Sequence, residues 1–262
     1  MCGRYFLQRD PAALARHFQT TNPTPNFAAT WNLAPTQEGL VVRRHPETGA
    51  RHLDVLRWGL VPHWAKDASG AARLMNARDD SVATKPSFRE AFRKRRCLVP
   101  MDGFYEWRAA GKSKQPFACA LRSGEPMACA GLWEGWKQPD GTWLRSYTII
   151  TTAAAGRQAL LHARMPVIMP REAWDPWLSG AEEAALLALL RPAEDSLLAF
   201  WPVAPRVGRV AENDAALLAR DPAAAAPPEL DDPPPPLDDA RARTRRQDAA
   251  MPEDPPPRPD DP

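Results

Sequence analysis

The sequence predicts an α+β protein, a β-rich single domain with a central curved or barrel-like mixed sheet and short peripheral helices. Two observations lead to this class. The 262 residues are 44% hydrophobic and 25% charged, which is an ordinary globular composition. Strand-like runs outnumber helical runs and do not alternate regularly with them, which disfavours a doubly wound parallel sheet.

The strand-like runs are short apolar segments bounded by glycine and proline. Asp140-Gly141 is a typical hairpin turn, and it is expected to join two strands between Trp136 and Trp143. The predicted strands are residues 52–60, 96–100, 116–121, 127–133, 146–152, 166–169 and 197–203.

Four short segments have helical character. Residues 11–18 carry the clearest start signal, because Asp10 can cap the helix and Pro11 suits its first position. The other predicted helices are residues 85–94, 182–190 and 213–220.

The chain divides by composition into a globular domain, residues 1–220, and a Pro/Asp-rich tail, residues 221–262. The tail holds 11 of the 32 acidic residues and 5 of the 34 basic residues, so the domain itself carries an excess of about eight positive charges. The tail has no aromatic residue and little apolar surface to offset its ordering entropy. We therefore expect the tail to be disordered and dispensable for chemistry.

Membrane and secreted classes are disfavoured. No apolar run approaches the ~18 residues that span a bilayer, and the first residues lack a signal-peptide pattern. Cys97, Cys119 and Cys129 lie in apolar contexts and none of the four cysteines forms a CxxC pair. The sequence thus indicates a reducing cytoplasmic location, with neither a metal nor a cofactor.

Cys2 is the most informative residue, because it directly follows the initiator methionine. Removal of Met1 would leave a free α-amine and a thiol on one residue. With reference pKa values of about 7.7–8.0 and 8.5, both groups would be partly reactive near neutral pH. Such a 1,2-aminothiol condenses with an aldehyde to an imine and then closes to a thiazolidine. The alternative is an incidental cysteine in a frayed terminus.

Three further polar residues stand beside apolar or strand-like segments. Asn76 lies two residues before Arg78, so an amide and a guanidinium would share one side of an extended segment. Glu106 lies between Tyr105 and Trp107, and apolar flanks favour the protonated carboxyl that general acid catalysis needs. His162 precedes Arg164. Taken singly, Asn76 could cap a turn, Glu106 could be a solvated charge, and His162 could be structural.

Taken together, these segments resemble the SOS response-associated peptidase (SRAP) family of abasic-site processing proteins. The resemblance covers residues 2 to about 215 in consistent order, and the tail has no counterpart. It is carried by MCGRY, WNLAPTQ, RWGLVPHW, the run from LMNARDD to GFYEW, KQPFACAL, TIITTAAA, HARMPVIM and WPVAPRVG.

The resemblance implies a role for each matching residue. Cys2 would form a thiazolidine with the ring-opened aldehyde of an abasic site in single-stranded DNA, and Asn76 would orient the Cys2 amine and the sugar. Glu106 would be the acid/base for ring opening, and His162 the proton shuttle that also serves reversal. The implied DNA-binding residues are Arg4, Arg78, Arg164 and Trp64. Lyase activity and removal of its own Met1 are further implied activities, in a monomer associated with the nucleoid.

The family pattern is not matched throughout, and two other functions stay open. Ala163 stands where the family often has Asp, and Ala155 where Asn is frequent, so the orientation of His162 is in question. The basic domain and its tryptophans would also suit a non-catalytic single-strand-binding module. A glutamine amidotransferase with an N-terminal cysteine is the other alternative, but the segments that hold glutamine in that class are absent.

Overall fold

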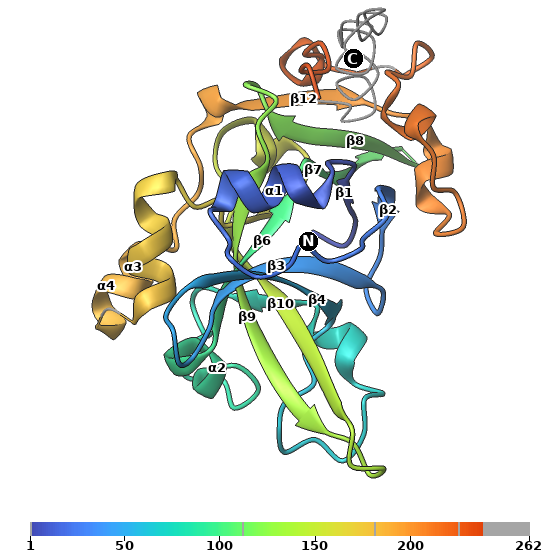
Figure 1. Cartoon of the computed structure of the whole chain (residues 1–262). Coiled ribbons are helices and arrows are strands. Elements are labelled where there is room, and N and C mark those ends of the chain that lie inside the picture. The colour runs from blue at the N-terminus through green and yellow to red at the C-terminus, as the bar shows by residue number, and fades with distance from the viewer. Residues whose placement is uncertain (1, 112, 181, 225, 238–262) are drawn as a thin grey trace, which may run out of the picture.

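Two β-sheets form the frame of the protein (Figure 1). The computed structural model describes residues 2–111, 113–180, 182–224 and 226–237. The first sheet is antiparallel throughout. Its strands, in spatial order, are β12 (Leu198–Pro202), β8 (Ser113–Leu121), β7 (Gly103–Ala110), β1 (Tyr5–Leu7) and β2 (Thr30–Leu33).

The second sheet closes into a five-stranded barrel. Its strands, in order, are β10 (Trp143–Ala153), β4 (Arg51–Trp58), β3 (Glu38–Arg44), β6 (Arg96–Met101) and β9 (Met127–Lys137), and β9 pairs back onto β10. The barrel is mixed because β10 and β4 run parallel. Two three-residue strands, β5 (Asn76–Arg78) and β11 (Arg164–Pro166), pair with the C-terminal half of β10. The predicted α+β class with a barrel-like mixed sheet is confirmed.

The helices are short and lie outside the sheets (Figure 1). In α1 (Pro11–Phe18), Asp10 Oδ1 accepts from the backbone N–H of Ala12 at 3.0 Å, which is the predicted cap. The others are α2 (Arg89–Lys94), α3 (Trp174–Ser179) and α4 (Glu183–Ala188). Among the described residues no helix has the length and apolar character needed to cross a membrane.

Several predicted boundaries were wrong for local reasons. The helix expected over 85–94 begins only at Arg89, because residues 85–88 form turns around Pro86. Residues 213–220 form a single 3₁₀ turn, Ala215–Leu218, rather than an α-helix. The strand expected over 166–169 is the earlier segment Arg164–Pro166, and Ile168 makes only an isolated bridge to Cys129.

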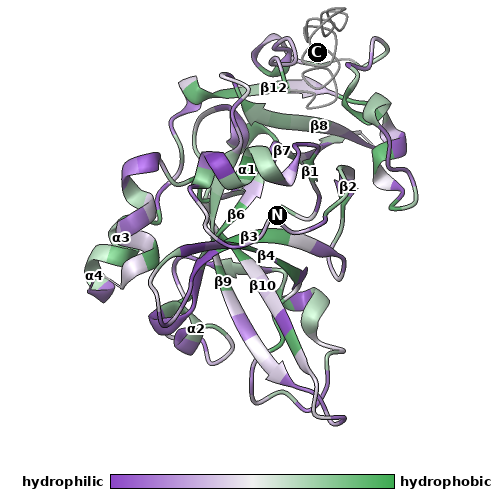
Figure 2. Cartoon of the chain, viewed as in Figure 1, coloured by the Kyte–Doolittle hydropathy of each residue, from purple (hydrophilic) through white to green (hydrophobic). Residues whose placement is uncertain are grey.

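Buried aromatic side chains fill the space between the sheets, and Figure 2 shows the apolar strands gathered there. Tyr5 from the first sheet and Tyr147 from the barrel share a hydrogen bond between their hydroxyl oxygens at 2.6 Å. Gly39 makes room for this pair, because a Cβ atom there would lie 2.3 Å from each hydroxyl oxygen. The pair links the two sheets beside the start of the chain.

The prediction that the chain is disordered from residue 221 onward does not hold for residues 226–237, which pack on the domain. Leu230 is fully buried in the core, and its neighbour Asp232 accepts hydrogen bonds from three other parts of the fold. Apolar side chains at 226, 230 and 237 supply the packing surface that the overall composition of the tail concealed. The predicted tail residues 238–262 lie outside the described residues.

The burial of all four cysteines predicts a loss of stability in mildly alkaline solution. Burial raises the pKa of each thiol in the folded protein, whereas unfolded thiols lose their protons near pH ~8.5. Above that pH the unfolded state binds fewer protons than the folded state. The free energy of unfolding should then fall by up to ~1.4 kcal/mol per pH unit for each thiol.

Urea unfolding under reducing conditions, from about pH 8 to pH 10, measures this effect. Cys119→Ala removes one of the four thiols and should make the decline shallower by roughly a quarter. A midpoint that stays constant over this range would contradict the burial of the thiols.

Candidate active site

Cys2 lies at the junction of the two sheets, three residues before β1. Its side chain is fully buried. Asn76, at the start of β5, donates from Nδ2 to the backbone oxygen of Cys2 at 2.7 Å. The pairing of Asn76 with Ile149 on β10 fixes the position of this amide. The structure therefore brings Cys2 and Asn76 together from segments 74 residues apart.

The amide oxygen of Asn76 is a buried acceptor. Among the described residues Oδ1 has no hydrogen-bond partner, although a buried polar atom without one is costly. An ammonium or a sugar hydroxyl bound there would supply the missing donor.

Glu106 lies on β7, next to the N-terminal segment. The backbone N–H of Tyr105 donates to the oxygen of Arg4 at 3.0 Å, so β7 runs beside residues 2–4. Glu106 is only 3% exposed, which rules out the alternative of a solvated charge. A buried carboxylate beside a buried thiol is suited to accept a proton.

The Cys2 thiol is less acidic than the sequence suggested. Burial is the main cause that raises its pKa well above the ordinary value, with smaller contributions from Cys129 and from the negative charge of Glu106. At neutral pH the thiol is therefore protonated rather than partly ionised. Any reaction through its sulfur needs a nearby base.

His162 stands in a tight loop between η2 (Gly156–Leu160), a 3₁₀ turn, and β11. Its backbone N–H donates to the oxygen of Gln158 at 3.0 Å, and its Nδ1 accepts from the backbone N–H of Arg164 at 2.9 Å. An accepting Nδ1 assigns the hydrogen of the neutral ring to Nε2. Nε2 is therefore the ring nitrogen whose hydrogen is available for transfer.

The two predicted phosphate-binding arginines differ in their surroundings. Arg78, at the end of β5, is 59% exposed and pairs with Asp80 at 2.5 Å. Arg164 is 13% exposed and donates to Asp79 Oδ1 at 2.7 Å and to the backbone oxygen of Thr151. Arg78 is thus accessible, whereas Arg164 joins β11 to the segment after β5.

Asp79 is a residue that sequence reasoning missed. Its second oxygen accepts from Thr152 Oγ1 at 2.6 Å, so one carboxylate ties Arg164 to β10. The only signal in the sequence was its place directly after Arg78, within the run Asn-Ala-Arg-Asp-Asp. Its partner Arg164 is 85 residues away, and no local pattern indicates the pair.

The other two predicted DNA-binding residues differ in their surroundings: Arg4 is bonded within the fold, whereas Trp64 is exposed. Arg4 donates to Asn32 Oδ1 at 2.9 Å and to the backbone oxygens of Val207 and Gly208, so it holds β1 to β2 and the segment after β12. Trp64 is 57% exposed at the edge of a hollow of about 300 Å³ formed by residues 60–74. Stacking on a base is open to Trp64, while a DNA contact by Arg4 stays a prediction.

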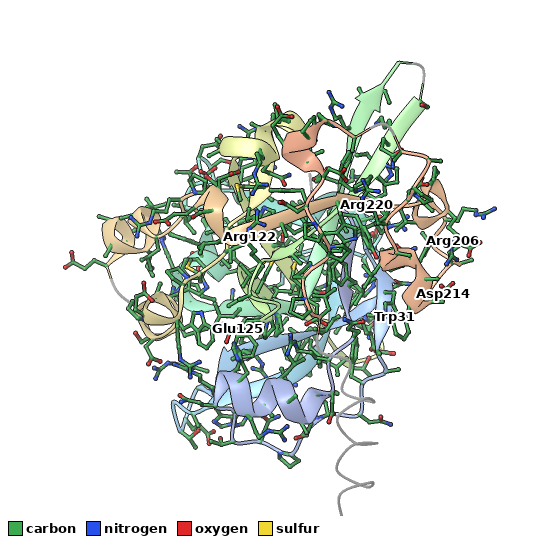
Figure 3. The ribbon with its side chains drawn as sticks, turned by 90° about the horizontal axis from the view of Figure 1, so that it is seen from above. Trp31, Arg122, Glu125, Arg206, Asp214 and Arg220 are labelled. Atoms are coloured by element: carbon green, nitrogen blue, oxygen red, sulfur yellow. The ribbon has the colours of Figure 1, made fainter. Side chains whose placement is uncertain are left out.

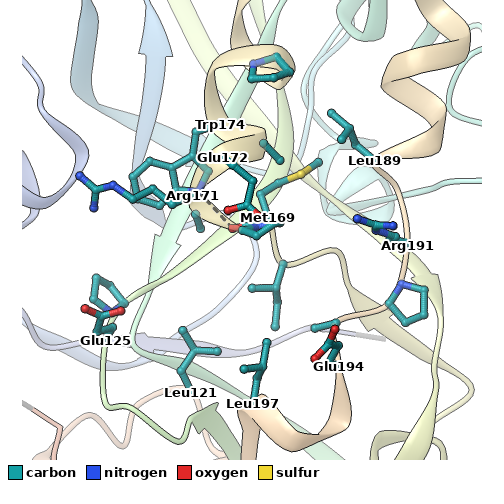
Figure 4. Close-up of a pocket in the computed structure, with 18 of the residues that line it drawn as sticks. Leu121, Glu125, Met169, Arg171, Glu172, Trp174, Leu189, Arg191, Glu194 and Leu197 are labelled. Carbon is teal, nitrogen blue, oxygen red and sulfur yellow. Dashed lines mark hydrogen bonds between the residues drawn. The ribbon is translucent and has the colours of Figure 1, made fainter.

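A larger cavity of about 670 Å³ lies elsewhere, between the β8–β9 turn and α3 (Figure 4). Glu125, Arg171, Trp174 and Arg191 are among its lining residues, and none of the predicted site residues reaches it. Among the described residues no group of three or more His, Cys, Asp or Glu side chains could hold a metal ion. Asn76 and Glu106 therefore lie beside Cys2, His162 lies in the loop before β11, and none of these residues lines this cavity.

Residues 1–210 match the family described as SOS response associated peptidase (SRAP). The chain is 34% identical over 223 residues to the abasic site processing protein YoqW of Bacillus subtilis, covering 83% of this chain and 99% of that protein. It is 33% identical over 216 residues to the abasic site processing protein HMCES of Gallus gallus, covering 70% and 64%.

Solved structures show the same fold. A protein from Bacteroides thetaiotaomicron superposes with a TM-score of 0.77 at 22% identity, covering 84% of this chain and all of the other. A protein from Bordetella bronchiseptica gives a TM-score of 0.67 at 26% identity, covering 78% and 100%. The two-sheet frame is therefore a fold found in other solved proteins.

Proposed function

This chain belongs to the SOS response-associated peptidase family, and on that premise we propose that it processes abasic sites in DNA by forming a covalent crosslink through Cys2. The relatives YoqW and HMCES are named for abasic-site processing, which supports the choice of substrate. The observation that carries the proposal is the buried Cys2, held by Asn76 and flanked by the buried carboxylate of Glu106.

The proposed chemistry starts with hydrolytic removal of Met1, which frees the α-amine of Cys2. The amine attacks the aldehyde of the ring-opened sugar, and loss of one water gives an imine. The thiol then adds to the imine carbon, its sulfur forming the new C–S bond and its proton passing to the nitrogen. The product is a five-membered thiazolidine joining protein and DNA.

The surrounding residues have distinct parts in this proposal. The Asn76 amide holds the Cys2 backbone oxygen and offers its free Oδ1 to the amine or the sugar. Glu106 gives a proton to the ring oxygen when the sugar opens and recovers one from the Cys2 ammonium, and it then relays the thiol proton to the nitrogen as the thiazolidine closes. His162, through Nε2, moves a proton on and off the sugar oxygen as the imine forms or reverts.

One experiment tests the proposal directly. Purified protein is mixed with a single-stranded oligonucleotide containing one abasic site and run on a denaturing gel, with the intact strand as control. A 1:1 adduct with the abasic strand alone is expected, and intact-protein mass spectrometry should show that Met1 is gone. Equal affinity for both strands without an adduct would indicate a non-catalytic binding module, and release of ammonia from glutamine would indicate an amidotransferase.

The difference between Arg78 and Arg164 yields a prediction about DNA affinity. Arg78→Ala should weaken binding to intact and abasic single strands alike, because phosphate contacts carry no base information. It should also reduce the slope of log affinity against log salt concentration by ~0.7 for each phosphate contact that is lost. Arg164→Ala should do the same and also lower the melting temperature, because Asp79 then loses its partner.

Fluorescence anisotropy over a salt series, with thermal melts, measures both effects. Arg93→Ala is a matched control, since Arg93 is 55% exposed on α2 and pairs with glutamates. If Arg78→Ala abolished the adduct while affinity and salt slope stayed unchanged, Arg78 would act in the chemistry rather than in binding.

A further inference from the structure

A segment beyond the family match is part of the fold. The match ends at residue 210, and residues 226–237, here called the C-terminal strap, pack across β12. Leu230 enters the core, and Asp232 pairs with Phe200 through its backbone N–H at 2.8 Å and its carboxylate at 3.0 Å. The strap therefore occupies a defined position on the first sheet.

Asp232 also binds Arg157, the residue with the most side-chain hydrogen bonds in this region. Arg157 Nη1 donates to Asp232 Oδ2 at 2.7 Å and to the backbone oxygen of Glu229 at 3.2 Å. Its Nε donates to Asp195 Oδ2 at 2.7 Å, and its Nη2 to the backbone oxygen of Leu198 at 2.7 Å. One guanidinium thus connects the strap, β12 and the turn before β12.

Arg157 belongs to the turn that carries His162. It lies in η2, and the next residue, the buried Gln158, accepts the backbone N–H of His162. Gly156 has a φ of +55°, and a Cβ atom there would lie 2.4 Å from Asp195 Oδ1, so the turn is seated against Asp195. The loop before His162 is therefore held from outside, by two carboxylates acting on Arg157.

We propose that Asp232 is a positioning residue for His162, acting from the C-terminal strap through Arg157 and η2. This inference rests on the proposed function, in which His162 transfers a proton at the abasic site. Asp232 and Arg157 are 17% and 19% exposed, so water screens this ion pair less than a surface pair. Loss of the pair frees η2 on one side, and a shift of about 1 Å at a reacting group can cost ~10²-fold in rate.

The neighbouring residue Asp231 provides a matched control. It binds Arg220 instead, with the guanidinium Nε at 2.9 Å from its Oδ1, and among the described residues its carboxylate forms no ion pair with Arg157 or Arg122. Figure 3 labels Arg220 and Arg122, the arginines that bind Asp231 and Asp232 respectively. Asp231→Asn and Asp232→Asn thus remove the same negative charge at adjacent positions of the strap, but each affects a different arginine partner.

The test measures the rates of crosslink formation and release for the full chain carrying each variant, alone and combined with His162→Ala. Asp232→Asn should slow release roughly five- to tenfold, below the ~10²-fold limit above, and should have no further effect when His162 is already alanine. Asp231→Asn should change neither rate. Asp232→Glu, which keeps the negative charge, should retain part of the release rate that Asp232→Asn loses.

Two outcomes would overturn the inference. An equal loss with and without His162 would show a general structural role, and unchanged rates for Asp232→Asn would show no role at all. Hydrogen exchange at the amides of residues 157–164 gives a readout that does not depend on the reaction. If the unmodified protein formed no adduct, the proposed function would fail, and faster exchange in Asp232→Asn but not in Asp231→Asn would still decide whether the strap fixes this loop.

Discussion

Cys2→Ala is expected to abolish the denaturation-resistant adduct with abasic single-stranded DNA. The variant keeps an α-amine after Met1 removal, so an imine can form, but no sulfur is present to close the ring. An imine is reversed by water, so it should not survive a denaturing gel without added reductant. Cys2→Ser should retain at most a weaker oxazolidine. Gel quantification over a time course measures both variants against the unmodified protein.

Cys97→Ala is the control for loss of a buried thiol. Cys97 lies on β6, is equally buried, and has a raised pKa, yet the proposal gives it no part in the reaction. Its adduct should form at the unmodified rate once folding has been checked by thermal melting. An undiminished adduct from Cys2→Ala would remove Cys2 from the chemistry.

Glu106→Gln is expected to have the second largest effect, slowing crosslink formation by the ~10²–10⁴-fold typical of general acid–base groups. An abasic sugar is mostly a closed hemiacetal, so a proton must move before the aldehyde appears. The Cys2 thiol then needs a base, because its pKa is raised by burial. Below that pKa the thiolate fraction rises about tenfold per pH unit, so the variant should regain rate as the pH rises from about 5 to 8.

His162→Ala should affect mainly a different step from Glu106→Gln. It is expected to slow crosslink formation less and release more, since Nε2 serves the return of the proton to the sugar oxygen. Forward rates and a trap assay for release, over the same pH range, distinguish the two residues. Glu134→Gln is the control for Glu106, because Glu134 is also buried but pairs with Arg95 in the barrel. Unmodified rates in both directions for Glu106→Gln would leave Glu106 without a catalytic role.

Regular strands were predictable where apolar runs lie between turn residues. The segments 52–60, 127–133 and 146–152 correspond to β4, β9 and β10. Asp140-Gly141 forms the expected hairpin turn between β9 and β10. The strands β1, β2, β3, β5 and β7 were not predicted. Residues 5–7 are too short to show a period, and β3 is buried on both faces along most of its length, so no alternation marks it.

The α+β class, the mixed barrel-like sheet and the family could be predicted from the sequence, because these depend on local periodicity and on motifs of adjacent residues. The surroundings of the candidate site residues became visible only in the folded chain. The burial that raises the Cys2 pKa, the Asp79–Arg164 pair and the contact of Asp232 with Arg157 join residues from separate parts of the chain. Desolvation and ion pairing depend on distance in space, and the packing of separate chain segments against each other sets that distance independently of any local sequence pattern.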